Sequence, residues 1–120
     1  GASFPSPRDI RGREIVGRDR VLWGNDYPHY EGCYPHSREN MRWAFAGVSE
    51  DDVRMMLGEN AAGLYGFDLE ALRAEGEALG ITAELVSQPL EEIPADSTCI
   101  TFVRERMERQ AAGTMTKQGA

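Results

Sequence analysis

Several features that would point to whole classes of protein are scarce or absent in this sequence. Cysteine occurs only twice in 120 residues, too few for a disulfide framework, so we expect a reducing, cytoplasmic compartment. No apolar run approaches the roughly 20 residues that a membrane-spanning helix needs, and no signal-peptide pattern stands at the start. Basic residues number 13 against 20 acidic ones, a formal net charge of −7. This balance argues against nucleic acid and anionic membranes as partners.

What the sequence does contain is the composition of a small globular domain. Hydrophobic residues make up 41% and charged residues 28% of the chain, and the length allows one domain at most. There is no internal repeat and no low-complexity tract. The chain opens on Gly1 without a Met, so we expect a processed or engineered product, or a piece of a longer protein.

A short apolar run near residue 22 predicts a buried strand. Val21-Leu22-Trp23 is followed by the turn residues Gly24-Asn25-Asp26, which places a strand over about 21–25. The run does not alternate with polar residues, and unbroken apolar strands are typical of parallel sheets covered on both faces. Residues 1–7 carry two prolines and are expected to form an entry loop, and 8–16 a short helix.

The rest of the chain has the spacing of helices. Ser37 and Asp68 are typical N-cap residues, and Ser49 with Asp52 resembles a capping box. The predicted helices cover about 38–46, 50–64 (as 50–57 and 59–64 on either side of Gly58), 69–79 and 97–110, with an irregular connector over 81–94 and a frayed polar tail over the last ten residues.

The helix expected over 97–110 is amphipathic. Its charged face carries an i,i+4 pair of Glu105 and Arg109. The predicted apolar stripe of the helix consists of Ile100, Val103 and Met107.

We divide the chain into two parts. Residues 1–80 hold the strand and the first helices, and residues 81–120 hold the connector, the helix over 97–110 and the tail.

A single strand leaves a structural question open. Its backbone donors and acceptors need partners, and one strand followed by several helices is not a complete α/β domain. Either Val21–Trp23 joins a sheet supplied by further sequence, or the chain is a small helical domain and the strand prediction is wrong.

The residues that follow the predicted strand are the best candidates for chemistry. Asp26 would stand at the carboxyl end of a buried strand, which is where α/β folds place their functional groups. A carboxylate there can ligate a cation or take a proton from water, whereas the alternative reading of Asp26 is a turn cap. His29 and His36 lie in the same loop and have hydrogen-bonded structural roles as their alternative.

A rival local interpretation is a small zinc site. Asp26, His29, Cys33 and His36 have the spacing D-x2-H-x3-C-x2-H, which offers four ligands for a tetrahedral ion. The pattern lacks the paired C-x2-C of zinc fingers. Cys33 lies beside the expected site and could be exposed, but an inert thiol is the default expectation for it and for Cys99.

Three blocks of the sequence resemble the C-terminal part of the amidohydrolase-related proteins, metal-dependent hydrolases and decarboxylases of the amidohydrolase superfamily. The resemblance extends over roughly residues 8–80 and rests on the order and spacing of the blocks. The blocks are Val21-Leu22-Trp23-Gly24-Asn25-Asp26-Tyr27-Pro28-His29, Pro35-His36-Ser37-Arg38, and Leu57-Gly58-Glu59-Asn60-Ala61-Ala62-Gly63-Leu64-Tyr65-Gly66-Phe67.

The resemblance implies a fold and a site. The fold would be the C-terminal fragment of a (β/α)8 TIM barrel, with 21–24 as its eighth strand and a divalent metal, zinc by preference, at the C-terminal face. Asp26 would be the catalytic carboxylate and a metal ligand, and His29 and His36 would lie in the second shell or the loop. Asn60 would be a cap or helix-packing group. The sequence lacks the H-x-H motif and the further histidines of this family.

These observations lead to one main hypothesis and two alternatives. The main hypothesis is the C-terminal part of an amidohydrolase-related hydrolase or decarboxylase that acts on a small organic substrate and is inactive as this fragment alone. The alternatives are a non-catalytic helical interaction module, in which 97–110 pairs with another chain, and the small structural zinc domain. The sequence does not separate hydrolysis from decarboxylation, and a homo-oligomer stays open.

Overall fold

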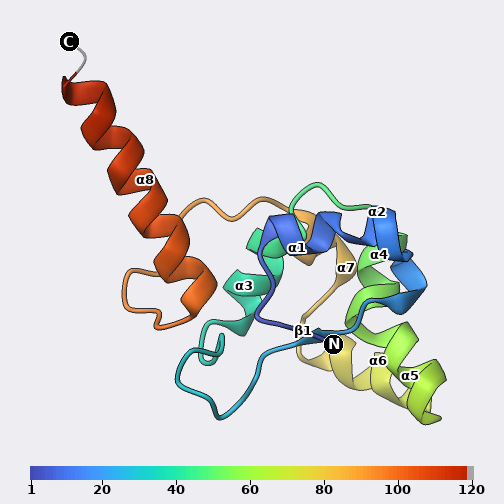
Figure 1. Cartoon of the computed structure of the whole chain (residues 1–120). Helices are drawn as coiled ribbons and strands as arrows, with labels where there is room; N and C mark the ends of the chain where they lie inside the picture. Colours follow the sequence, from blue (N-terminus) through green and yellow to red (C-terminus); the bar gives the residue numbers. More distant parts are fainter. Residues whose placement is uncertain (119–120) are drawn as a thin grey trace.

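Most of the fold is helical, and the only sheet among the described residues has two parallel strands, β1 and β2 (Figure 1). The computed structural model describes the backbone of residues 1–118 and the side chains of residues 1–113. The elements in chain order are β1 (Ala2–Ser3), α1 (Pro7–Arg11), α2 (Arg13–Val16), η1 (Arg18–Arg20), β2 (Trp23–Gly24), α3 (Ser37–Ala44), α4 (Glu50–Arg54), η2 (Met55–Glu59), α5 (Asn60–Tyr65), α6 (Leu69–Ala78), α7 (Ala83–Ser87) and α8 (Ile100–Gln118).

The predicted strand over 21–25 is present as β2 but is shorter, and its partner comes from this chain. β1 pairs with β2 in parallel, with Ala2 opposite Trp23. The Ala2 N–H donates to the Leu22 carbonyl at 2.7 Å, and the Phe4 N–H donates to the Gly24 carbonyl at 2.8 Å. Residues 1–7 are therefore not only an entry loop, and the expectation of a strand without a partner in this chain is wrong.

The helix predicted over 8–16 is divided into α1 and α2. Ser6 and Asp9 form a capping box at the start of α1, and Pro7 occupies its first turn. Gly12 separates the two helices, and a Cβ there would lie 2.9 Å from the Asp9 carbonyl oxygen. The close approach of these two backbone segments explains why a glycine stands at the break.

The helix predicted over 38–46 is α3, which begins and ends slightly earlier. Ser37 is its first residue rather than its N-cap, so that part of the prediction is wrong. His36 occupies the N-cap position without a side-chain cap bond, and the Ser37 hydroxyl accepts a hydrogen bond from the Cys33 thiol at 3.5 Å. Gly47 follows the helix with φ 74°, a conformation that favours glycine.

The helices predicted over 50–57 and 59–64 form one run, because α4, η2 and α5 follow each other without a break. η2 is a π-helical turn that contains Gly58. Ser49 caps α4 as predicted, accepting a hydrogen bond from the Asp52 N–H at 3.2 Å. The Asp52 carboxylate bonds to Arg13 and Arg18 instead of reaching back to Ser49, so the capping-box prediction is only half right.

The prediction for 69–79 is confirmed, and the prediction for the connector over 81–94 is partly wrong. Asp68 caps α6 through the Ala71 N–H at 3.1 Å, and Gly80 follows with φ 67°. The connector contains α7, which Thr82 caps through the Leu85 N–H at 3.1 Å. A helix of five residues is too short to give a clear periodic signal.

α8 begins later and ends later than the helix predicted over 97–110, and in Figure 1 it extends away from the other helices. The predicted frayed tail is helical up to Gln118, and 119–120 lie outside the described residues. The predicted apolar stripe is only partly right, because Ile100 and Val103 are half-buried but Met107 is 63% exposed, and Phe102, which the prediction left out, is fully buried. The Glu105–Arg109 pair is confirmed at 2.8 Å.

Two clusters of buried residues form the core. The smaller one joins the base of α8 to the loop before α3 and consists of Cys33, Cys99 and Phe102. Trp23 packs against both clusters, so β2 lies where they meet. The larger cluster consists of Ile10, Met41, Ala44, Phe45, Val48, Val53, Met56 and Val86.

Candidate functional site

Asp26 lies just beyond the end of β2, in a turn that leaves its carboxylate available. Its φ is 61°, in the left-handed region that Asp and Asn tolerate better than most residues. The Asn25 side chain, not that of Asp26, accepts the hydrogen bond of the Tyr27 N–H at 3.0 Å. The turn is completed by the His29 N–H, which donates to the Asp26 carbonyl at 2.8 Å. The structure therefore gives the turn-cap role to Asn25.

The freed carboxylate of Asp26 meets His29. Its Oδ2 lies 2.9 Å from His29 Nδ1, and the two side chains are 35% and 72% exposed. An ionised carboxylate only accepts, so His29 Nδ1 is the donor of this bond. A carboxylate held by a histidine at the end of a strand is an arrangement that can serve acid–base chemistry.

The loop that carries this pair folds back on the end of β2. The Cys33 N–H donates to the Asn25 carbonyl at 3.1 Å. Gly32 is buried, and a Cβ there would lie 2.5 Å from the Asn25 carbonyl oxygen. The loop also receives a hydrogen bond from the Thr98 hydroxyl to the Tyr30 carbonyl at 2.7 Å. These bonds hold Asp26 and His29 on a fixed backbone.

The prediction that Cys33 is exposed beside the site is wrong. Cys33 and Cys99 are both free and fully buried. Burial raises the pKa of the Cys33 thiol, while the Ser37 hydroxyl acts in the opposite direction. A buried, protonated thiol is a poor nucleophile. The burial of both cysteines agrees with the expectation that their thiols are inert.

His36 points to a different partner. Its Nε2 lies 3.2 Å from Asp96 Oδ1, in the segment before α8. The residues that the structure describes contain no group of three or more His, Cys, Asp or Glu side chains that could hold a metal ion. Because Asp26 pairs with His29, Cys33 is buried beside Ser37 and His36 pairs with Asp96, the four-ligand zinc prediction is wrong.

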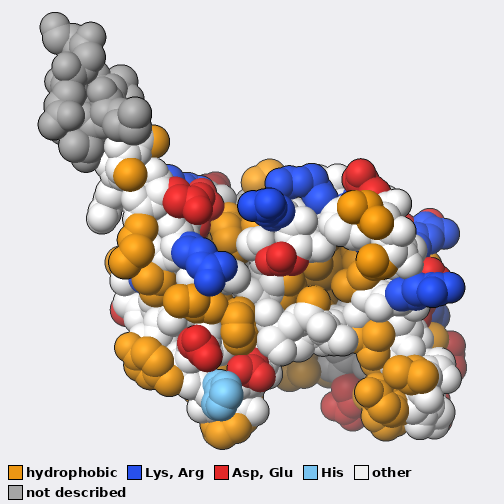
Figure 2. Space-filling view, in the orientation of Figure 1, with side chains coloured by type: hydrophobic (Ala, Val, Ile, Leu, Met, Phe, Trp, Pro, Cys, Tyr) orange, Lys and Arg blue, Asp and Glu red, His pale blue; other side chains and the backbone are white. Residues whose placement is uncertain are grey.

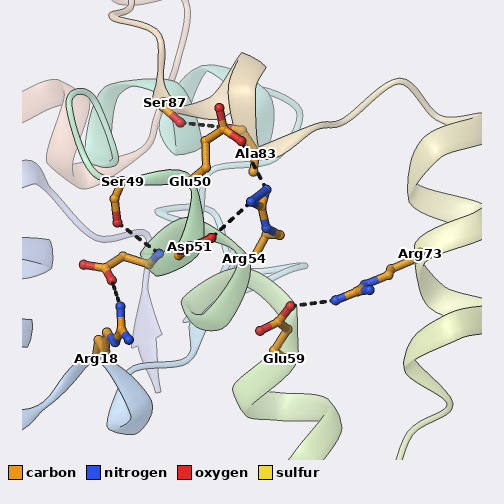
Figure 3. A network of polar contacts seen from close by, with 10 residues as sticks. Arg18, Ser49, Glu50, Asp51, Arg54, Glu59, Arg73, Ala83 and Ser87 are labelled. Carbon is orange, nitrogen blue, oxygen red and sulfur yellow. Dashed lines mark hydrogen bonds and ion pairs between the residues drawn. The ribbon is translucent and has the colours of Figure 1, made fainter.

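The segment that leads into β2 is held by side chains from α4 and α5. The Asn60 amide donates to the carbonyls of Arg18 and Val21, each at 2.8 Å, which confirms a packing role for Asn60. Asp52 accepts from Arg18 at 2.6 Å and from Arg13 at 3.2 Å, and Figure 3 shows the contact of Arg18. The Arg18 bond is the main cause that lowers the pKa of Asp52. These contacts fix the direction in which β2 delivers Asp26.

Three exposed tyrosines lie in the same loop as the Asp26–His29 pair, and the sequence-based prediction of the site did not include them. Tyr27, Tyr30 and Tyr34 are 65%, 81% and 63% exposed. The rings of Tyr27 and Tyr34 meet edge to face with centroids 5.1 Å apart. Three tyrosines within eight residues of a predicted loop were the available signal, because exposed aromatic groups are enriched at binding surfaces.

Comparison with known families bears directly on this segment. Residues 10–67 match the family model described as amidohydrolase. This segment is amidohydrolase-related. The matched residues run from α1 to the end of α5 and include β2, Asp26, His29 and Asn60, and they end before α6. Searches of curated proteins and of solved structures gave no match.

The match supports a relationship to hydrolases of this family and leaves the substrate open. The segments from α6 to α8 lie beyond it. Within the described part of the chain, no helix is both long enough and apolar enough to cross a membrane.

Proposed function

We propose that this chain supplies the Asp26–His29 part of an amidohydrolase-type active site that acts on a small organic substrate. The observation that carries the proposal is the Asp26 carboxylate, which stands at the end of β2 and is hydrogen-bonded to His29 at 2.9 Å inside the matched segment. Hydrolysis is the proposed reaction, and decarboxylation is the variant that the same residues would serve.

The proposal includes the architecture that the family implies. β2 would be the last strand of a (β/α)8 barrel, with Asp26 at its C-terminal face, where such barrels carry their active sites. The parallel pairing of β1 and β2 and the position of Asp26 after the strand support this placement. A site of this kind is completed by several βα loops, so the segment alone would be inactive.

The chemistry of the pair follows from its geometry. Asp26 Oδ2 is occupied by His29, which leaves the other carboxylate oxygen to accept a proton from a water molecule that attacks the substrate. The bond to the leaving group breaks as that proton is returned to it. His29 would hold the carboxylate in place and share the charge, which makes His29 a positioning residue.

Amidohydrolases generally use divalent metal ions, and the described residues do not form a metal site by themselves. Asp26 and His29 are two side chains, and His36 faces Asp96 instead. Stable zinc sites use three or four protein ligands. The predicted zinc ion, with Asp26 as a ligand, is therefore part of the proposal only for a site that further polypeptide completes.

The test compares Asp26→Asn with the unaltered sequence in the complete protein that contains these residues. Asparagine tolerates the left-handed backbone and can still accept the His29 hydrogen bond, so the loop should keep its shape. Amides, esters and carboxylic acids serve as probes, with released amine, alcohol and carbon dioxide measured separately. We expect Asp26→Asn to lower kcat by about 100-fold or more, because a proton acceptor is lost.

Two further variants make the test specific. Asp68→Asn removes a carboxylate that caps α6 outside the site and should leave kcat unchanged. His29→Gln should lower kcat less than Asp26→Asn does and should shift the pH profile. Unchanged turnover in Asp26→Asn, or equal losses in Asp26→Asn and Asp68→Asn, would overturn the assignment. Release of carbon dioxide instead of amine or alcohol would identify a decarboxylase.

A further inference from the structure

A groove of about 520 Å³ separates α6 from α4, η2 and α7. α6 has ten residues and none of them is buried, although two of them are leucines. Leu72 lies on the wall of the groove and is 49% exposed. The apolar side chains that line it are Val53, Leu57, Leu69, Leu72, Ile81, Ala83 and Val86.

An ion pair links the two walls of the groove. Arg73 on α6 reaches Glu59 on η2 at 2.8 Å, and Figure 3 shows this ion pair crossing between the helices. Gly58 and Gly76 also line the groove, and a Cβ at either position would have no atom within 4 Å. The groove is therefore open and preformed, with room beside the backbone on both walls.

The groove lies at the end of the molecule where exposed hydrophobic residues gather. Figure 2 shows hydrophobic side chains over α5 and α6. Leu64, Tyr65, Phe67 and Leu79 are each more than half exposed, at 67%, 64%, 56% and 63%. Exposed apolar side chains of this kind are typical of interaction surfaces.

The charge around the groove limits what can occupy it. Arg54 and Arg73 line it, but Arg54 pairs with Glu50 at 3.2 Å and Arg73 with Glu59 at 2.8 Å. Glu77 also lines it, and among the described residues this side chain has no ion pair or hydrogen bond. Glu75 on α6 and Glu84 on α7 are likewise exposed and without such partners in the described part of the chain. The uncompensated charge at the rim is negative.

We propose that this groove binds an amphipathic helix of a partner protein whose apolar face is flanked by Lys and Arg. Helices bind such grooves by placing residues at i, i+3, i+4 and i+7 into the apolar floor. A second copy of this chain would bring two negative rims together, and an anionic membrane would be repelled by the same rim. The α6 and α7 side of the groove lies outside the matched family segment, so the proposal does not rest on the proposed function.

The test uses two synthetic helical peptides with the same leucine face, one flanked by lysines and the other by glutamates. Binding of each peptide to the full chain is measured by titration calorimetry at low and at moderate salt. We expect the lysine peptide to bind about tenfold or more tightly than the glutamate peptide and to weaken as salt rises.

Matched variants locate the binding site. Leu72→Ser should weaken binding of the lysine peptide about fivefold, because half of a leucine side chain no longer contributes. Ile15→Ser is the control, since Ile15 is 90% exposed on α2 and does not line the groove. Glu77→Gln should weaken binding, whereas Glu108→Gln removes the same charge from α8 and should not.

Three results would overturn the proposal. The first is no binding of the lysine peptide, or equal binding of both peptides. The second is an equal effect of Leu72→Ser and Ile15→Ser. The third is a dimer of the unaltered chain in sedimentation that Leu72→Ser converts to a monomer, because the groove would then belong to a second copy.

Discussion

The indole Nε1 of Trp23 donates a hydrogen bond to Oδ1 of Asn40 at 3.2 Å. Asn40 is fully buried, and its Nδ2 donates to the Pro5 carbonyl at 3.3 Å. The side-chain amide of Asn40 on α3 therefore forms one hydrogen bond with a residue of β2 and another with a carbonyl just after β1. This arrangement ties β1 and β2 to the helix that follows the candidate site.

Replacing Asn40 should destabilise the fold more than an ordinary amide loss. Asn40→Ala leaves the Trp23 indole N–H and the Pro5 carbonyl without their partner in a buried place, so we expect a loss of about 2–3 kcal/mol in the free energy of unfolding. Urea unfolding of the variant and of the unaltered chain measures this loss. Gln88→Ala is the control, because Gln88 is exposed. Equal midpoints for the two variants would contradict the role of Asn40.

The Asp52 carboxylate should make stability depend on pH. Hydrogen bonds from Arg18 and Arg13 lower its pKa in the folded chain, so its contribution is present above the unfolded pKa of about 3.9 and is lost as the pH falls through the folded value. We expect Asp52→Asn to cost about 1 kcal/mol at pH 7, with a smaller difference from the unaltered chain near pH 3.

Asp51→Asn is the matched control for Asp52. Its carboxylate is 80% exposed and pairs with Arg54 at 3.1 Å. Exposed pairs of this kind contribute little, so Asp51→Asn should change stability by less than about 0.5 kcal/mol at pH 7. An Asp52→Asn effect that stays constant from pH 7 to pH 3 would refute the electrostatic explanation.

Local signals in the sequence were sufficient for some elements. Asp68 and Gly80 enclose α6 as expected, because a side-chain cap and a positive φ are properties of a few neighbouring residues. β1 was missed because its two residues carry no pattern and form a strand only by pairing with β2. α7 was missed because it is short.

The candidate site likewise has one part that the sequence predicts and one part that it does not. Asp26 was predicted from its position after an apolar run, and its bond to His29 joins residues three apart, which the sequence could have suggested. The contact of His36 with Asp96 joins segments 60 residues apart, and the burial of Cys33 depends on Cys99 and Phe102 from the other end of the chain. These long-range contacts exclude the zinc site, and they cannot be predicted from the spacing of four residues within one loop.

Two glycines should respond to alanine in opposite ways. Gly32→Ala places a Cβ 2.5 Å from the Asn25 carbonyl oxygen, so the loop must shift, at an expected cost of about 2 kcal/mol or more. Gly63→Ala in α5 meets no atom within 4 Å and should add about 0.5–1 kcal/mol of stability through helix propensity. Thermal and urea unfolding of the two variants distinguish the cases, and a neutral Gly32→Ala would contradict the close approach.

Cys33 should react slowly in the folded chain. The thiol is fully buried, so the reagent cannot reach the sulfur. Burial also raises the pKa of the thiol, which lowers the fraction of reactive thiolate. We expect iodoacetamide at pH 8 to label the folded chain about two orders of magnitude more slowly than the chain in urea. Fast labelling of one cysteine under native conditions would show that the loop around Asp26 opens readily.

The raised pKa of Cys33 also has a consequence for stability at alkaline pH. The unfolded thiol ionises near pH 8.5, whereas the folded thiol stays protonated, so this group favours unfolding progressively as the pH rises towards the folded value. The unaltered chain should therefore lose more stability between pH 7.5 and about pH 10 than Cys33→Ser does. All other titratable groups are the same in both chains, so the difference between the two stability curves isolates the thiol. Parallel stability curves for the two chains would show that Cys33 is reached by water in the native state.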